Sequence, residues 1–118
     1  MTALPTPPEW AWESNDWAAA LTLLRSDMLR DKLQPGDVDF TRNTWGIPGI
    51  DFEGIRARSG PWSDGEKLFL DLANELFNRG AQVRLADLIA TLDATNWAIA
   101  MRAVRIKRFG VAWLRLHA

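Results

Sequence analysis

Apolar residues recur at helical spacing in several stretches of the chain, and turn-forming residues separate these stretches. The first stretch predicts a helix over about residues 15–33, because Ser14 and Asn15 offer side-chain caps at its start. Pro35 and Gly36 end this helix, since proline cannot continue the backbone hydrogen bonds and glycine accepts the turn. The side chains expected to share its buried face are Trp17, Leu21, Leu24 and Met28.

The clearest helix start in the sequence is Ser63, which is followed three residues later by Glu66. A serine at the cap position accepts from the amide of the third helical residue, and a glutamate there reaches back to the cap amide. Gly80 is well placed to follow the last turn of this helix. Its expected inward residues are Leu68, Phe69, Leu72, Ala73, Leu76 and Phe77.

Two further helices are expected near the end of the chain. The first is short, over about residues 84–92, and the second is capped by Asp93 or Thr95 and continues to about Phe109. Gly110 ends the longer helix, and the remaining residues 111–116 are too few to distinguish a strand from a final turn. The residues of the short helix expected to face inward are Leu85, Leu88, Ile89 and Leu92.

The segments outside these helices are rich in glycine, proline and tryptophan. Residues 35–62 contain eight glycines and prolines among scattered apolar side chains, which predicts an ordered irregular loop and leaves a short hairpin open. Such a loop serves equally well as a binding surface or as a lid over the core. Residues 1–13 form a proline- and tryptophan-rich arm that we expect to pack down. The sequence thus predicts a single all-α, or nearly all-α, domain of four main helices over residues 1–118.

Composition removes most catalytic chemistry from consideration. The 118 residues are 47% hydrophobic and include no cysteine and one histidine, so disulfide, thiolate and histidine-cluster sites are excluded. The start of the chain lacks a basic and then apolar leader, and no stretch reaches the roughly 20 apolar residues needed to cross a bilayer. We therefore expect a cytoplasmic protein without a membrane partner.

No pattern in the chain points to an enzyme. His117 stands next to the last residue, where few neighbours could orient its ring. No phosphate-binding glycine loop and no serine nucleophile elbow occurs. We expect no catalytic residue, no cofactor and no metal. The third and weakest hypothesis is an enzyme that binds a metal through the carboxylates of Asp64, Asp71 and Glu75. The other carboxylate pairs considered for a metal site are Asp27 with Asp31 and Asp37 with Asp39.

Charge is distributed unevenly although the net charge is only −1. After Asp93 the chain has five basic residues and no acidic one. Together with the short helix, the tight turn and the longer helix, this predicts a helix-turn-helix-like DNA-binding regulator as the alternative function. Its candidate nucleic-acid residues are Arg102, Arg105, Lys107 and Arg108.

Helical geometry weakens this alternative. Arg102 and Arg105 share a face, whereas Arg108 falls near a stripe made by Trp97, Met101 and Val104, and Lys107 points elsewhere. The same basic residues would equally suit a helix end and ion pairs with acids elsewhere in the fold.

Seven tryptophans and no tyrosine give the chain an unusual aromatic content. Several tryptophans lie in irregular segments, where they could form an exposed apolar patch, and large aromatic side chains dominate protein interfaces. The favoured function is therefore a non-enzymatic protein that binds another protein, with a homo-oligomer also open. The candidate interface residues are Trp10, Trp12, Trp45 and Trp62.

Residues 61–110 resemble a loosely defined group of small helical proteins of actinobacteria and their phages. The resemblance implies a phage- or mobile-element-encoded regulator or inhibitor of a host protein, and it brings no activity and no site residues with it. The last helix of the group is less basic than here, which argues against DNA binding as a property of the whole group. The resemblance is carried by Trp62, Ser63, Gly65, Glu66, Leu72, Ala73, Leu76, Phe77, Asn78, Val83, Leu85, Leu88, Leu92, Asp93, Asn96, Ala103, Val104 and Gly110.

Overall fold

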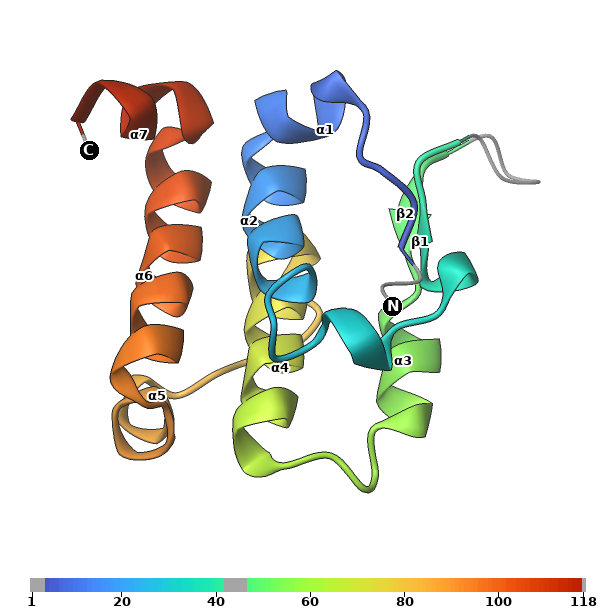
Figure 1. The fold of residues 1–118 in the computed structure, drawn as a ribbon, viewed down its shortest axis with the longest axis vertical. Coiled ribbons are helices and arrows are strands. Elements are labelled where there is room, and N and C mark those ends of the chain that lie inside the picture. Colours follow the sequence, from blue (N-terminus) through green and yellow to red (C-terminus); the bar gives the residue numbers. More distant parts are fainter. Residues whose placement is uncertain (1–3, 42–46, 118) are drawn as a thin grey trace.

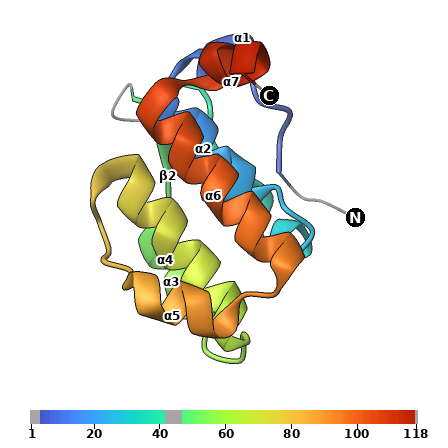
Figure 2. The same cartoon turned by 90° about the vertical axis from the view of Figure 1, so that its left-hand side faces the viewer.

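The fold is built around one central helix. In the computed structural model, which describes residues 4–41 and 47–117, α2 (Asn15–Leu24) packs against both α4 (Asp64–Asn78) and α6 (Ala94–Phe109) (Figure 1). A view from the side shows α6 lying along α2 (Figure 2). The predicted mainly helical class is confirmed, with one two-stranded sheet beside the helices.

Neighbours bury α2 on nearly every side, because its middle consists of three alanines. Ala18 and Ala19 join Ile106 of α6 in one apolar cluster, whereas Ala20 joins the main core. Small side chains let the backbones of packed helices approach closely, and the larger residues fill the space toward α4. The buried residues of α2 are Trp17, Ala18, Ala19, Ala20, Leu21, Leu23 and Leu24.

The first predicted helix ends nine residues earlier than the sequence pattern indicated. α2 stops at Leu24, and the chain turns at Ser26, whose hydroxyl donates to the Leu23 carbonyl oxygen at 2.6 Å. A serine that bonds the nearby backbone offers the chain an alternative to the helix. The turn and the following 3-10 helix (Arg30–Lys32) return Leu29 and Leu33 to the core, where both are buried. The prediction of one continuous helix over residues 15–33 is therefore wrong.

Two short helices that the sequence analysis did not assign lie together at one end of the molecule. The arm contains α1 (Glu9–Glu13) and residues 111–116 lie in α7 (Val111–His117), and these two helices contact each other (Figure 2). Gly110 separates α6 from α7 with φ of 90°, and a side chain there would meet the Asn15 side-chain oxygen at 2.9 Å. The side-chain Nδ2 of Asn15 donates to the Lys107 carbonyl oxygen at 3.3 Å, which joins the start of α2 to the end of α6.

Residues 35–62 contain more regular structure than an irregular loop. The hairpin left open by the sequence is present as β1 (Val38–Asp39) and β2 (Gly49–Ile50), which pair antiparallel with Val38 opposite Ile50. The segment also holds α3 (Phe52–Arg58), which the sequence did not predict because Gly54 lies inside it. Asp37, a buried carboxylate, accepts from the Arg58 guanidinium at 2.5 Å and so ties α3 to the start of the hairpin.

The three later helices begin where the sequence indicated. Ser63 and Glu66 form the predicted capping box of α4, and Asp93 accepts from the Asn96 amide at the start of α6. α5 (Leu85–Thr91) lies between them. Arg79, and not Gly80, takes the left-handed conformation after α4, with φ of 60°. The described residues thus contain seven helices where four main ones were predicted, the additional ones being α1, α3 and α7.

Enlarging a side chain where α2 meets its neighbours should destabilise the protein. We expect Ala19→Leu to lower the free energy of unfolding by about 1–3 kcal/mol, because a leucine side chain cannot enter a fully buried alanine site without displacing other atoms. Ala57→Leu, at an exposed position of α3, is the matched control and should change it by less than about 0.5 kcal/mol. Urea unfolding followed by circular dichroism measures both, and equal effects would show that α2 tolerates a wider spacing.

Candidate functional site

The outer side of α5 is an exposed apolar surface. Leu85 and Ile89 are 60% and 63% exposed, so the prediction that they face inward is wrong. Leu88 is the only buried residue of α5, and Leu92, the residue directly after α5, is half-buried. At about 100° per residue, the exposed residues Leu85, Ala86, Ile89 and Ala90 cover an arc of roughly 140° without a charge. We call this surface the α5 arc.

The orientation of α5 explains why the sequence pattern failed there. Asp87 and Thr91 line a depression together with Asp64, Lys67, Leu68 and Asp71 of α4, so the polar side of α5 is turned toward α4. The side that faces the core lies at the edge of the apolar stripe, at Leu88, and not at its centre. Periodicity shows that apolar residues share a side of a helix, but only packing decides which side is covered.

The tryptophans proposed as one patch do not lie together in the described residues. Trp10 and Trp12 are two residues apart on α1 and therefore point to different sides. Trp62 precedes α4, whose start lies at the opposite end of the molecule from α1 (Figure 1). Trp10 is 39% exposed, and Trp12 and Trp62 are half-buried. Trp45 falls outside the described residues.

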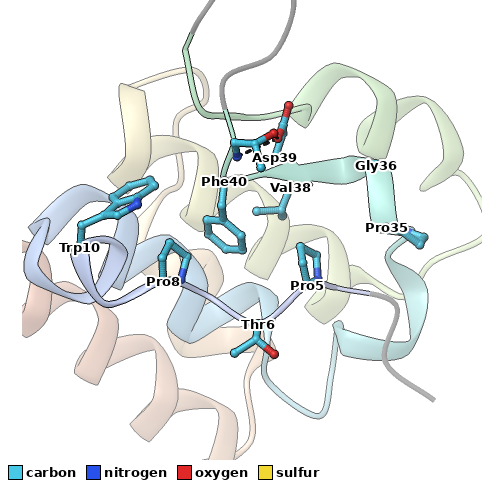
Figure 3. A pocket seen from close by; sticks show the side chains of 10 residues that line it. Pro5, Thr6, Pro8, Trp10, Pro35, Gly36, Val38, Asp39 and Phe40 are labelled. Carbon is cyan, nitrogen blue, oxygen red and sulfur yellow. Dashed lines mark hydrogen bonds between the residues drawn. The ribbon is translucent and has the colours of Figure 1, made fainter.

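Trp10 borders an apolar groove of about 540 Å³ between the N-terminal arm and the hairpin (Figure 3). The Trp10 ring packs edge-on against Trp17 at 5.4 Å and against Phe40 at 6.3 Å between centroids. Asp39 supplies a carboxylate at the rim, and one of its oxygens already accepts from the amide and hydroxyl of Thr41. The remaining lining residues are Pro5, Thr6, Pro8, Pro35, Gly36 and Val38.

The four basic candidates on α6 separate into two kinds. Lys107 forms an ion pair with Asp16 of α2 and is therefore engaged in the fold. Arg102, Arg105 and Arg108 are exposed, and none of the three forms an ion pair within the part of the chain that the structure describes. The side of α6 that faces α2 consists of small and aliphatic residues, namely Ala100, Ala103 and Ile106. Val104 is exposed, so its stripe with Trp97 and Met101 flanks the core instead of filling it.

Aromatic rings continue from the end of α6 along α7. Phe109 stacks on Trp113 at 4.2 Å, and Trp113 stacks on His117 at 4.1 Å. The Arg108 guanidinium lies 5.0 Å from the centre of the Phe109 ring. His117 also shares a hydrogen bond at 2.8 Å between its Nδ1 and the Trp113 carbonyl oxygen. His117 is thus held by this stack, with no acidic partner to activate it within the described residues.

The carboxylates considered for a metal site have structural contacts. Asp71 pairs with Arg56 of α3 at 2.7 Å, and Glu75 accepts from the Val83 amide at 2.9 Å. Asp64 shares the depression between α4 and α5 with Lys67. Residues 4–41 and 47–117 contain no group of three His, Asp or Glu side chains placed to hold a metal ion.

Comparison with family models, with curated proteins and with solved structures gives no match to this chain. None of the described helices is long and apolar enough to span a membrane. The fold therefore defines the class, a small helical domain. Its candidate sites are the exposed α5 arc, the groove beside Trp10 and the arginines of α6.

Trp62 lies beside an ion pair at the start of α4. Lys32 lies 3.1 Å from a Glu66 carboxylate oxygen and 6.0 Å from the centre of the Trp62 ring. Burial acts to raise the pKa of Glu66, but hydrogen bonds from the Ser63 amide, Lys32 and the Ser63 hydroxyl outweigh it, together with the charge of Lys32. The pKa of Glu66 is therefore below its ordinary value.

A lowered folded-state pKa makes the stabilising effect of Glu66 depend on pH. Its contribution is complete above the unfolded-state pKa and is lost as pH falls through the folded-state pKa. We expect Glu66→Gln to lower the Tm at pH 7 by an amount worth less than about 1 kcal/mol, because Lys32 stays partly exposed. This difference should vanish between about pH 5 and pH 3.

The matched control for this titration is Glu53→Gln, which changes an exposed first-turn glutamate of α3. Thermal melts of the three proteins across this pH range provide the measurement. A gap between wild type and Glu66→Gln that persists at pH 3 would mean that the charge of Glu66 is not what stabilises the helix start.

Proposed function

We propose that this chain is a non-enzymatic protein that acts by binding another protein, and that the α5 arc is its binding surface. The observation that supports this proposal is the exposure of two large aliphatic side chains, Leu85 and Ile89, on a helix of only seven residues. Contiguous exposed apolar surface of this kind is typical of sites that a partner covers. Covering one such side chain contributes roughly 1.5–3 kcal/mol.

The position of the α5 arc fits this role. α5 reaches the rest of the fold mainly through α4, so its outer side is free to enter a partner's groove without disturbing the core. An amphipathic helix that lays its apolar side into a groove of another protein is a common mode of recognition. The groove beside Trp10 shares no lining residue with the arc.

We further propose a cytoplasmic regulator or inhibitor of a host protein, encoded by a phage or mobile element. The resemblance of residues 61–110 to small proteins of actinobacteria and their phages supports this part, and it directs the search for a partner to an actinobacterial lysate. A second copy of the chain is another partner that the arc could take, and the oligomeric state separates the two cases.

Placing charges in the α5 arc should abolish partner binding and leave the fold intact. We expect the double variant Leu85→Asp/Ile89→Asp to retain a specific partner at least about tenfold less than the wild type, since it removes the apolar contacts and desolvates two carboxylates. Its Tm should stay close to that of the wild type, because both positions are more than half exposed. Immobilised protein, nuclease-treated lysate and quantitative mass spectrometry measure the retention.

The matched control is Leu116→Asp, which charges an aliphatic residue that is 82% exposed on α7. Proteins lost with the arc variant but kept with this control identify the partner. Light scattering of the purified chain tests the second-copy case, in which the wild type is a dimer and the arc variant a monomer. Retention that is equal for all three proteins, with a monomeric wild type, would remove the arc from consideration.

DNA binding through α6 is the second candidate function. It is favoured by Arg102, Arg105 and Arg108, which are exposed without an ion pair in the described chain. The short α5, the turn at Leu92 and Asp93 and the long α6 also follow the helix-turn-helix order. Against it, the first turn of α6 offers Ala94, Thr95 and Ala98 to a groove, and these read bases poorly.

Salt dependence distinguishes this second function from the first. If the three arginines contact phosphates, the logarithm of the affinity for duplex DNA should fall with that of the salt concentration with a slope near −3. The variant Arg105→Gln/Arg108→Gln should reduce this slope by about 2. Fluorescence anisotropy with a labelled duplex measures both, and an affinity independent of salt would eliminate the α6 surface as a DNA site.

A further inference from the structure

A depression of about 330 Å³ lies where four helices meet, and its lining combines two arginines with apolar side chains. Four helices from distant parts of the sequence contribute to this lining. The residues are Trp12 of α1, Thr22 of α2, Arg102 and Ile106 of α6, and Val111 and Arg115 of α7. Neither the α5 arc nor the groove beside Trp10 includes any of these residues.

The charge in this depression is entirely positive. Arg102 and Arg115 both border it, no carboxylate lines it, and neither arginine forms an ion pair in the described residues. Two like charges that border one depression repel each other, and an anion bound there offsets this cost. Guanidinium groups bind phosphate and carboxylate with paired hydrogen bonds, which makes an arginine pair from two helices well suited to a tetrahedral oxyanion.

The apolar part of the lining is suited to a flat ring. Trp12 is half-buried, Ile106 is buried and Val111 is half-buried, so they present an apolar surface that is fixed by the core. Indole faces stack on nucleobases, and such stacking tolerates any base because every base has a π face. Thr22 adds a hydroxyl, which donates to the Ala18 carbonyl oxygen at 2.8 Å and keeps its lone pairs as acceptors.

A neighbouring depression shows where the ligand does not extend. It shares Trp12, Val111 and Arg115 but is also lined by Glu9 and Glu13 of α1. Carboxylates there repel a phosphate, so the favourable potential is confined to the depression that Arg102 lines.

We infer that the depression between Arg102, Arg115 and Trp12 binds a nucleotide, with its phosphate on the two guanidinium groups and its base over the indole. This site goes beyond the proposed protein-binding function and does not require the α5 arc. The same chemistry is offered by a free nucleoside monophosphate and by the terminal nucleotide of a single strand, and the experiment separates these two sources.

The test titrates the full chain, labelled with ¹⁵N, with AMP, with inorganic phosphate and with a ten-residue deoxyadenylate strand. We expect saturable binding of AMP that shifts one or two of the indole N–H resonances, and much weaker binding of phosphate alone, which lacks the ring. Arg102→Gln and Arg115→Gln should each weaken AMP binding about tenfold or more, because each removes a charge-assisted contact to the phosphate. Arg105→Gln is the matched control, since it removes an exposed arginine of the same helix that does not line the depression.

Each outcome decides the inference. Loss of AMP binding in Arg102→Gln and Arg115→Gln, but not in Arg105→Gln, supports it, and a strand that binds more tightly than AMP at the same indole identifies the single strand as the source. Absence of saturable AMP and strand binding at low salt overturns it. Equal losses in all three variants also overturn it, because binding would then be to the general charge of α6. Phosphate that binds as tightly as AMP removes the ring from the site and overturns the assignment as a nucleotide pocket.

Discussion

The close packing of α2 between α4 and α6 is the constraint on which the rest of the structure depends. Ala18, Ala19 and Ala20 give α2 almost no side-chain bulk at its middle, so neighbouring helices can approach it from more than one side. The leucines and Trp17 then fill the remaining space toward the core. A helix buried in this way leaves little of its surface for function, so binding surfaces form mainly on the elements around it.

Those surrounding elements end up at opposite ends of the molecule. At one end, α1 and α7 meet above the start of α2, where Asn15 and Gly110 touch, and this meeting brings Trp12 close to Arg115 (Figure 2). At the other end, α5 is supported mainly by α4, and none of the described residues covers its apolar outer side. The two proposed sites therefore follow from how the short helices are attached, and each can act without the other.

Some basic residues form ion pairs that hold the fold together, and others form none in the described chain. Lys32, Arg56, Arg58 and Lys107 pair with carboxylates that lie far from them in the sequence, and these contacts join separate elements. Arg102, Arg105, Arg108 and Arg115 come after the last acidic residue, and none of them forms an ion pair in the described chain. The uneven charge of the sequence thus persists on the folded surface, on α6 and α7.

Local rules in the sequence determined where the later helices begin, because caps such as Ser63 with Glu66 and Asp93 act within one turn of backbone. They also indicated the mainly helical class. Only tertiary structure decided that α2 ends at Leu24, before the turn at Ser26, and that residues 111–116 form a helix. It likewise turned Leu85 and Ile89 to the solvent and placed Arg102 and Arg115 around Trp12. These features depend on contacts between residues far apart in the chain, and periodicity along one segment holds no information about what covers its faces.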